Sequence, residues 1–530
     1  MSINQNKLLE RFPPIVEPEN RGKTNPAIQL YGRRFYKDQT PVEYLAEFLL
    51  VFVSPKGNSD NKTGAYSLQL KLNDGLPRYW PKDRIALKLF AFFPFSKLET
   101  RHPVHRETYL EALNIIKKCI IGSSENQDTI IRLIQSFFAG FVGVAKNRTW
   151  VTQSFLPASS ALLARELDWL HSEANGQSNL QTWSDVKQYF ATDRHNFMAR
   201  GGELLFLQLA HLFSSKKSSD IDSLCSTTGY KHLERVDLIK LRESIETELQ
   251  MILQDAVVSV DELSKFIENI LNDYQLHDDI KPALLGWVPT ASLPEAFLFA
   301  NELNNICLSR LGALEKIDFL QLLCCMQVLR SLCCQSRRFD DHNNGTDGFF
   351  GKYVWIVADP DADISSGIRK LAQKSFESIE DMLYRVLRNA AKSLGEQPEN
   401  FKEADKNGFQ IFRKIAKEIG LVIPLKGRGQ RFVLAPHLLR FLVAALLAPG
   451  ERVRLTEFYA RVFAHYGIAL GDRQLAAALA WSGNESGNKD YAVAADTSWI
   501  EEALQQGGFL VELSDAVSIV HNPGGKEQRA

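Results

Sequence analysis

The sequence predicts a mainly α-helical protein, with an irregular multi-helix body and a C-terminal winged-helix-like α+β domain. Three observations carry this prediction. Apolar residues recur at the helical period between residues 106 and 400, the pattern changes near residue 400, and short helices and strands alternate after it. Because 530 residues are too many for one core, we expect three regions: residues 1–105, 106–400 and 401–530.

The first region should begin irregularly, because prolines interrupt its first forty residues. A helix is then expected from Pro41 to just before Pro55. Thr40 is a suitable N-cap, and Glu43 follows it by three residues, as in a capping box. The apolar stretch RIALKLFAFFPFS, from Arg84, predicts either a buried strand or a short core helix.

The second region should be a helical body. Its long amphipathic segments include TIIRLIQSFFAGFVGV, SALLARELDWLHSE and EKIDFLQLLCCMQVLRSLCC. No fixed internal period indicates a solenoid, so we expect an irregular bundle. An aromatic strand-like run is expected over residues 353–358, and a long helix from about residue 364 to 394.

The third region has a different rhythm. A helix ending at Gly420 precedes the basic segment PLKGRGQRFVL, and three short helices follow. A strand-like YAVAAD, a further helix and a β-like FLVELSDAVSIV complete the region. Short helices with glycine-containing turns, followed by strand pairs, are typical of a winged-helix arrangement.

Composition and charge limit the function classes. The chain is 45% hydrophobic and 24% charged, as in a globular protein, and its formal charge of −1 gives no general affinity for nucleic acid. The N-terminal residues lack the apolar core of a signal peptide, and we expect no apolar run of about 18 residues that would span a bilayer. We therefore expect a cytoplasmic protein without membrane contact.

The seven cysteines predict reduced thiols. Their number is odd, and Cys324, Cys325, Cys333 and Cys334 form adjacent pairs in an apolar, helical context. A zinc site would need cysteines spaced about two residues apart with partner histidines, and the sequence lacks that spacing. No cofactor is expected.

Catalytic motifs are also missing. The sequence has no phosphate loop GxxxxGK[ST] in a strand–helix context, no GxGxxG after a strand, no HExxH and no GxSxG. An ATPase, a dehydrogenase, a zinc protease and a serine hydrolase therefore lack support, and we expect a protein that is not an enzyme.

One acidic cluster keeps an enzymatic alternative open. Asp359, Asp361 and Asp363 follow the strand-like run, and carboxylates at the end of a strand can hold Mg²⁺, as many nucleases require. The structural alternative, which we favour, is that Asp363 caps the next helix while the other carboxylates interact with its dipole.

Two further motifs have a structural and a functional interpretation. Gly201 and Gly202 open a helix, where they either bind a phosphate or let two helices approach closely, and the second is favoured. His102 and His105 either ligate a metal or lie in a solvated basic turn, and Pro103 between them favours the turn.

The clearest electrostatic signal is a basic patch in the third region. Between residues 409 and 471 the chain has ten Lys or Arg against three Glu, a net charge of +7 in a nearly neutral protein. Such a surplus suits phosphate binding, although winged-helix folds also contact proteins. The candidate nucleic-acid-binding residues are Lys414, Lys417, Lys426, Arg428, Arg431, Arg452 and Arg454.

Four stretches resemble blocks in components of bacterial multigene anti-phage defence loci. They are YGRRFYKDQTPVEYLAEFLLVF, NRTWVTQSFLPASSALLARELDW, RHNFMARGGELLFL and FVLAPHLLRFLVAALLAPGERVRLTEFYARVFAHYGIALG, which together cover about a fifth of the chain. The resemblance implies a defence component that works with partner proteins such as a helicase, an ATPase or a nuclease. It supplies no catalytic residue.

The sequence therefore predicts a non-enzymatic accessory or scaffold subunit that contacts DNA or a partner effector through its basic C-terminal domain. Two alternatives stay open at this point. One is a metal-dependent nuclease that uses the Asp cluster, and the other is a protein–protein adaptor without nucleic-acid contact.

Overall fold

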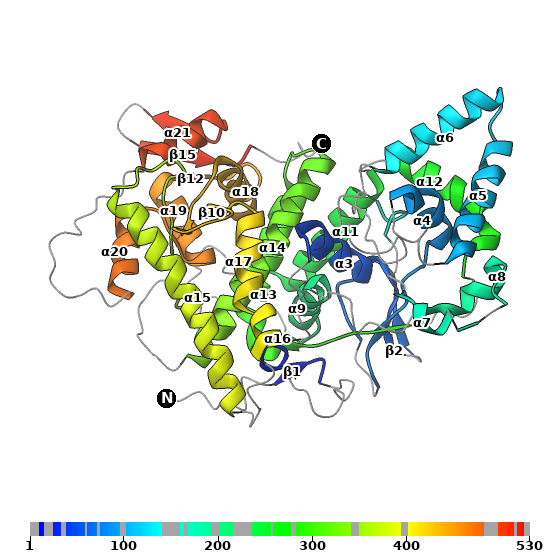
Figure 1. The fold of residues 1–530 in the computed structure, drawn as a ribbon. Helices are drawn as coiled ribbons and strands as arrows, with labels where there is room; N and C mark the ends of the chain where they lie inside the picture. Colours follow the sequence, from blue (N-terminus) through cyan, green and yellow to red (C-terminus); the bar gives the residue numbers. More distant parts are fainter. Residues whose placement is uncertain are drawn as a thin grey trace. The chain divides into compact units, whose positions relative to one another are not determined.

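The computed structural model describes the following residues: 10–14, 25–32, 39–58, 61–71, 75–95, 102–139, 159–163, 168–174, 176–177, 179–191, 201–215, 236–255, 258–276, 282–340, 349–393, 401–481, 497–513 and 517–523. These residues are mainly helical, with small sheets of two to four strands (Figure 1). The chain forms two compact units. The large unit comprises Met1–Lys37, Leu204–Leu249 and Gly286–Ala530, and the small unit comprises Asp38–Glu203 and Gln250–Leu285.

The small unit contains helices and two small sheets. Its helices are α3 (Pro41–Val53), α4 (Ile85–Phe92), α5 (Pro103–Lys118), α6 (Ser124–Ala139), α7 (His171–Ala174), α8 (Trp183–Val186) and α12 (Val258–Ile270). One sheet has the strand order β3-β2-β4-β7, from Asn61–Thr63, Lys56–Asn58, Arg78–Tyr79 and Ala283–Leu284. The other pairs β5 (Asp168–Trp169) with β6 (Phe190–Ala191).

The capped helix predicted after Thr40 is confirmed as α3. The backbone N–H of Thr40 donates to the Glu43 carboxylate at 2.8 Å, and Pro41 occupies the first helical position. The apolar stretch from Arg84 forms a helix, α4, rather than a strand. Its residues Ile85, Leu89 and Phe90 are fully buried, so it is a core helix of this unit.

The helix predicted over SALLARELDWLHSE is wrong in its described part. Residues 160–162 form a turn, Asp168–Trp169 forms β5, and only His171–Ala174 is helical. The Trp169 ring explains the strand, because it packs tilted against Phe190 and edge-on against His105, at ring-centroid distances of 5.0 and 4.5 Å. Burial of this aromatic side chain outweighs the helical period of the surrounding residues.

The large unit holds the remaining elements. Its helices are α2 (Pro26–Tyr31), α13 (Leu293–Leu308), α14 (Ala313–Phe339), α15 (Gly367–Ser393), α16 (Phe401–Lys406), α17 (Phe409–Glu418), α18 (Pro436–Leu446), α19 (Leu455–Tyr466), α20 (Asp472–Trp481) and α21 (Ser498–Gln506). The strands β1 (Arg11–Phe12) and β8 (Val288–Pro289) pair antiparallel. The boundary between the two units falls within α9 (Gly201–Ser215) and α11 (Leu238–Asp255).

Helix α14 forms the centre of the large unit. It is long and apolar enough to cross a bilayer, but 83% of its apolar window is buried among α13, α15, α17 and α18, so it is a core helix. The cysteines Cys324, Cys325, Cys333 and Cys334 lie buried in α14 as free thiols, as the sequence predicts for these four. Burial raises the pKa of all four thiols, so they stay protonated.

A first module follows α14. It contains β9 (Trp355–Ile356), α15, α16, α17 and an antiparallel hairpin of β10 (Val422–Ile423) and β11 (Arg431–Phe432). Ala358 forms a parallel bridge with Val433, which joins the strand before α15 to the end of the hairpin. Trp355 is fully buried and packs on Phe432 at 5.7 Å, so aromatic burial holds the module together.

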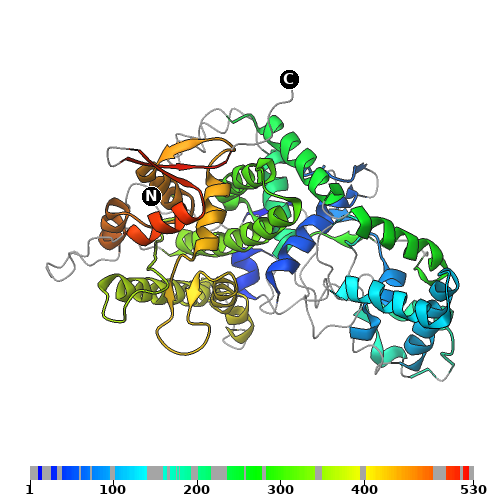
Figure 2. The same ribbon diagram turned by 90° about the horizontal axis from the view of Figure 1, so that it is seen from above.

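A second module extends from α18 to residue 522. Its elements run helix α18, strand β12 (Arg452–Arg454), helices α19, α20 and α21, and the strands β14 (Leu510–Leu513) and β15 (Val517–His521). These three strands form a sheet of order β12-β15-β14. Figure 2 shows α19 and α21 on one side of its strands, coloured orange to red. The strand β13 (Ile468–Ala469) pairs in parallel with β9 and so joins the two modules.

Most elements of these modules match the predicted ones. The long helix predicted from about residue 364 is α15, which begins at Gly367, and the predicted aromatic strand is β9. The segment YAVAAD, predicted as a strand, lies outside the described residues.

Candidate nucleic-acid interface

The candidate interface begins with α17, which is amphipathic. Ile411, Phe412 and Ile415 are buried on its inner side, so the intervening polar residues face outward. After the helix ends, Gly420 adopts a left-handed conformation, with φ of 76°. The chain then reverses into the hairpin that contains the basic segment.

The turn of this hairpin, residues 424–430, displays two cations. Val422 pairs with Phe432 and Ile423 with Arg431, so the residues between them form the loop at the end of a short ladder. Gly427 and Gly429 have φ of 98° and 77°, a region that glycine occupies without strain. Lys426 precedes Gly427, and Arg428 lies between the two glycines. Both side chains are exposed and form no ion pair with a described residue.

Arg431 has a different role from its neighbours in the segment. Its side chain is only 5% exposed, and its Nη2 donates to the carbonyl oxygen of Pro360 at 3.0 Å. Burial, together with the nearby charge of Arg369, lowers the pKa of Arg431. The structure therefore places Arg431 as a link between the base of the hairpin and the turn after β9, away from the exposed pair.

The cations of α17 are partly neutralised. Lys414 pairs with Glu418 one turn later at 3.5 Å. Arg413 forms a two-pronged ion pair with Glu380 of α15, at 2.5 and 2.8 Å, and these hydrogen bonds raise the pKa of Arg413. Lys417 forms no ion pair with a described residue, and burial together with the charge of Arg413 lowers its pKa.

The other cations of the basic patch belong to the second module. Arg452 and Arg454 are exposed on β12, in the sheet of that module rather than in the hairpin. Arg440 pairs with Glu315, and Arg461 pairs with Glu451 and Glu457. The +7 surplus of the sequence is therefore not one continuous surface, since acidic residues elsewhere in the chain neutralise part of it.

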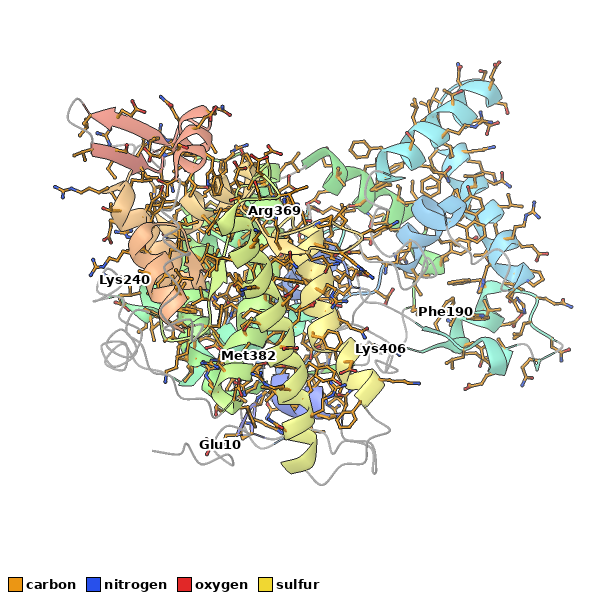
Figure 3. All side chains as sticks on the ribbon, turned by 60° about the vertical axis from the view of Figure 1, so that its left-hand side comes forward. Glu10, Phe190, Lys240, Arg369, Met382 and Lys406 are labelled. Atoms are coloured by element: carbon orange, nitrogen blue, oxygen red, sulfur yellow. The ribbon has the colours of Figure 1, made fainter. Side chains whose placement is uncertain are left out.

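Sequence reasoning missed two further cations on α15, the helix that packs against the hairpin strand β11. Arg369 lies in the first turn of α15, where Figure 3 labels it, and Lys370 follows it with an exposed side chain. Helix α15 packs against β11, and a Cβ on Gly429 would lie 3.9 Å from Gln373 Oε1 of α15. These residues are about sixty positions from the hairpin in sequence, so no local pattern could have joined them.

The acidic cluster lies next to the hairpin but does not gather into a site. Asp359 Oδ1 accepts a hydrogen bond from the backbone N–H of Asp361 at 2.9 Å, while the Asp361 and Asp363 side chains are exposed. Among the described residues no three His, Cys, Asp or Glu are arranged to hold a metal ion. The expected capping by Asp363 is also wrong, because α15 begins four residues later, at Gly367.

The Gly-Gly step at the start of α9 is a site of close helix approach, as favoured. A Cβ on Gly202 would lie 2.1 Å from the Tyr44 carbonyl oxygen and 2.5 Å from the Phe48 amide nitrogen of α3. The Gly202 N–H already donates to the Glu47 carboxylate at 3.0 Å. This amide is therefore occupied, and a bound phosphate at this step has no support.

The expectation of a solvated turn at His102 and His105 is wrong. His102 is the N-cap of α5, and its Nδ1 accepts from the Val104 N–H at 3.3 Å. His105 is fully buried, with its ring against Trp169. Pro103 suggested a loop, but it occupies the first helical position, where proline is well tolerated.

A buried charged network connects the second module to the core. Arg330 of α14 donates to both carboxylate oxygens of Glu302 on α13, at 2.7 and 2.8 Å, and both side chains are fully buried. His465 of α19 shares Glu302 Oε1 through its Nδ1 at 2.8 Å. Gln327 accepts from the Arg330 Nε at 2.8 Å. Because α19 belongs to the second module, this network fixes that module to α13 and α14.

The pKa directions in this network agree with a charged pair and a neutral histidine. Burial opposes ionisation of Glu302, but Arg330 and His465 outweigh it and hold the pKa of Glu302 below its usual value. Burial lowers the pKa of His465, and the charges of Arg330 and Arg461 lower it further against the pull of Glu302.

Comparisons of the chain with protein-family models, with curated proteins and with solved structures gave no match. The residues and their geometry are therefore the basis for a functional conclusion.

Proposed function

We propose that this protein is a non-enzymatic accessory subunit that contacts nucleic acid through its first module. The observation that carries the proposal is the exposed pair Lys426 and Arg428 at the end of a glycine-containing hairpin, next to a helix with polar, cationic residues on its outer side. Cations on such a projection reach phosphates without reading bases, so the contact would supply affinity and position rather than sequence specificity.

The arrangement of elements supports winged-helix character in both modules. In the first, three helices precede a hairpin whose second strand is bridged to the strand before them. In the second, the order helix, strand, helices, strand, strand with the sheet order β12-β15-β14 is typical of a winged helix. On this assignment α17 and the basic turn are the helix and the wing of the first module.

The two modules differ in the charges on the helix before the hairpin and on the hairpin turn. In the first module the wing carries Lys426 and Arg428, and α17 carries Lys414 and Lys417. In the second, the helix before the hairpin is α21, which bears Glu501 and Glu502 and no cation. Arg452 and Arg454 of the second module lie on β12, apart from α21, so only the first module combines a cationic helix with a cationic hairpin turn, and we place nucleic acid there.

The cellular setting of the proposal comes from the resemblance of four sequence blocks to components of bacterial anti-phage defence loci. We propose that the protein works there with a helicase, an ATPase or a nuclease. The products of neighbouring genes should co-purify with it. If the neighbouring genes encode proteins unrelated to nucleic-acid processing, the proposed role in defence is contradicted, whereas the proposed DNA contact is unaffected.

The DNA contact is tested by fluorescence anisotropy with a labelled 20-base-pair duplex, titrated between about 50 and 300 mM NaCl. For Lys426→Ala/Arg428→Ala we expect weaker binding and a log–log salt dependence shallower by about 1.8, because each lost phosphate contact removes about 0.9. The matched control is Lys118→Ala/Lys240→Ala, which removes two exposed cations outside both modules (Figure 3 labels Lys240).

Three outcomes separate the alternatives. If the wild type and Lys426→Ala/Arg428→Ala, the hairpin variant, bind the duplex equally well, the proposed DNA contact of the hairpin turn is refuted. Negligible duplex affinity at low salt would favour the adaptor. Mg²⁺-dependent cleavage of the duplex that is lost on Asp361→Ala would establish the nuclease instead.

A further inference from the structure

The outer face of the sheet in the second module combines two kinds of exposed residue. Side chains of directly paired residues lie on the same face of a sheet, and neighbours along a strand alternate between faces. Val511 pairs with Ile519, Leu513 with Val517, and Arg454 with Ile519. All five residues therefore share one face.

This face points away from the helices of the module. The opposite face carries Leu510 and Val520, which are 8% and 0% exposed and pack towards α19 and α21. On the outer face Val511, Leu513 and Val517 are 45%, 50% and 38% exposed. Three exposed aliphatic side chains on one small sheet form an apolar surface, and exposing such a surface to water is unfavourable in free energy.

The charges on the same face lie to one side of the aliphatic residues. Arg452 and Arg454 are exposed on β12, at one edge of the sheet, while Val511 and Leu513 lie on β14, at the other. His521 pairs with Arg452 and adds a polar side chain to the basic edge. The face is therefore aliphatic along one edge and cationic along the other.

We propose that this face is the docking site for an amphipathic helical segment of a partner protein, with aliphatic residues on one side and carboxylates along one flank. The aliphatic side would cover Val511, Leu513 and Val517, and the carboxylates would lie over Arg452 and Arg454. This partner is separate from the nucleic acid proposed for the first module.

The size of the face favours a single segment over a second folded copy. Three strands about 4.8 Å apart and up to five residues long give a face of about 14 by 17 Å. Stable interfaces between folded proteins bury about 800 Å² on each side, several times this area. One helix, about 10–12 Å across, covers the face.

The chemistry of the face favours protein over nucleic acid. Sheets that bind single-stranded nucleic acid stack bases on aromatic rings. The residues that β12, β14 and β15 contribute to this face include no Phe, Tyr or Trp, and the adjacent Phe509, before β14, is only half-exposed. Exposed aliphatic side chains gain nothing from phosphates, whereas they gain from contact with an apolar helix.

Two fluorescent 16-residue peptides test the proposal on the full-length chain. Both carry the same Leu positions on one helical side, and they differ in having Glu or Lys along the flank. We expect the Glu peptide to bind about tenfold more tightly than the Lys peptide, with a preference that weakens in salt. Arg452→Glu/Arg454→Glu should reverse this preference.

The variant Val511→Ser/Leu513→Ser tests the aliphatic edge of the face. It should lower the affinity for the Glu peptide about tenfold. The matched control is Ile239→Ser/Leu314→Ser, at exposed apolar residues elsewhere in the large unit, and it should bind like the wild type. Hydrogen exchange gives a second readout, because the bound peptide should protect the amides of β14 and β15.

Several results would overturn the proposal. They are absence of Glu-peptide binding, equal binding of the two peptides, and binding that neither sheet variant changes. A loss of duplex DNA affinity in Arg452→Glu/Arg454→Glu as large as that in the hairpin variant would assign the face to nucleic acid. Failure of the hairpin variant alone would refute only the proposed DNA contact.

Discussion

The buried pair of Arg330 and Glu302 offers the sharpest test of how the second module is held in place. Replacing Arg330 by Met keeps most of the side-chain volume but leaves the Glu302 carboxylate fully buried, with the hydrogen bond to His465 still in place. Removing one partner of a buried pair costs about 3–5 kcal/mol, because the other charge loses its compensation.

The double variant Arg330→Met/Glu302→Met should recover part of this loss. Both charges are then absent, and replacing a complete buried pair by apolar groups is often neutral. Recovery should stop short of the wild type by about 1–3 kcal/mol, since the Gln327 side-chain oxygen loses the donor that Arg330 supplied.

Hydrogen exchange at the backbone amides of α19 is a suitable assay. It reports the free energy of openings that expose the network, and it does not require the two units to unfold together. The matched control is Arg440→Met, which breaks the half-exposed ion pair with Glu315 and should cost less than about 1 kcal/mol.

Two results would refute this reasoning. One is a cost for Arg330→Met no larger than that for Arg440→Met. The other is a double variant no more stable than Arg330→Met alone, which would mean that lost packing, rather than an uncompensated charge, causes the effect.

The remaining predictions concern acidity and close packing. Because the pKa of His465 is lower in the folded protein than its usual value of about 6.5, the unfolded chain takes up the proton first as the pH falls. Stability should therefore drop below about pH 6.5 by up to about 1.4 kcal/mol per pH unit from this group, and His465→Gln should flatten that part of a denaturation profile; parallel profiles would contradict it. Gly202→Ala should destabilise the protein by about 1–3 kcal/mol in thermal unfolding, since the new methyl group meets the backbone of Tyr44 and Phe48. Gly312→Ala, with nothing within 4 Å, is its control, and similar melting temperatures would contradict the contact.

Local chemistry explains where prediction from sequence succeeded. Three correct predictions depend only on residues within a few turns of one another. They are the capping box of Thr40 and Glu43, the left-handed conformation of Gly420, and the helical period of apolar residues in α14. The same reasoning failed at residues 160–173, where packing of Trp169 against distant aromatic rings decides the conformation.

At the candidate interface, too, local sequence predicted some features and tertiary packing decided others. The sequence singled out Lys426 and Arg428, and the structure places both in an exposed turn. It also singled out Arg431, which is buried against the carbonyl of Pro360. Position in the hairpin decides the difference: Lys426 and Arg428 lie in the turn, whereas Arg431 lies within the ladder, opposite Ile423, on a strand whose two residues are both buried.

By itself the sequence determined the mainly helical class, the approximate ends of α3, α15 and α17, and the local charge surplus of the C-terminal region, because these depend on neighbours in the chain. Only the tertiary structure decided which cations stay free, that the acidic cluster does not converge, and that Arg330, Glu302 and His465 meet in one buried network. This network joins residues 163 positions apart, Glu302 and His465, and no local pattern carries that information.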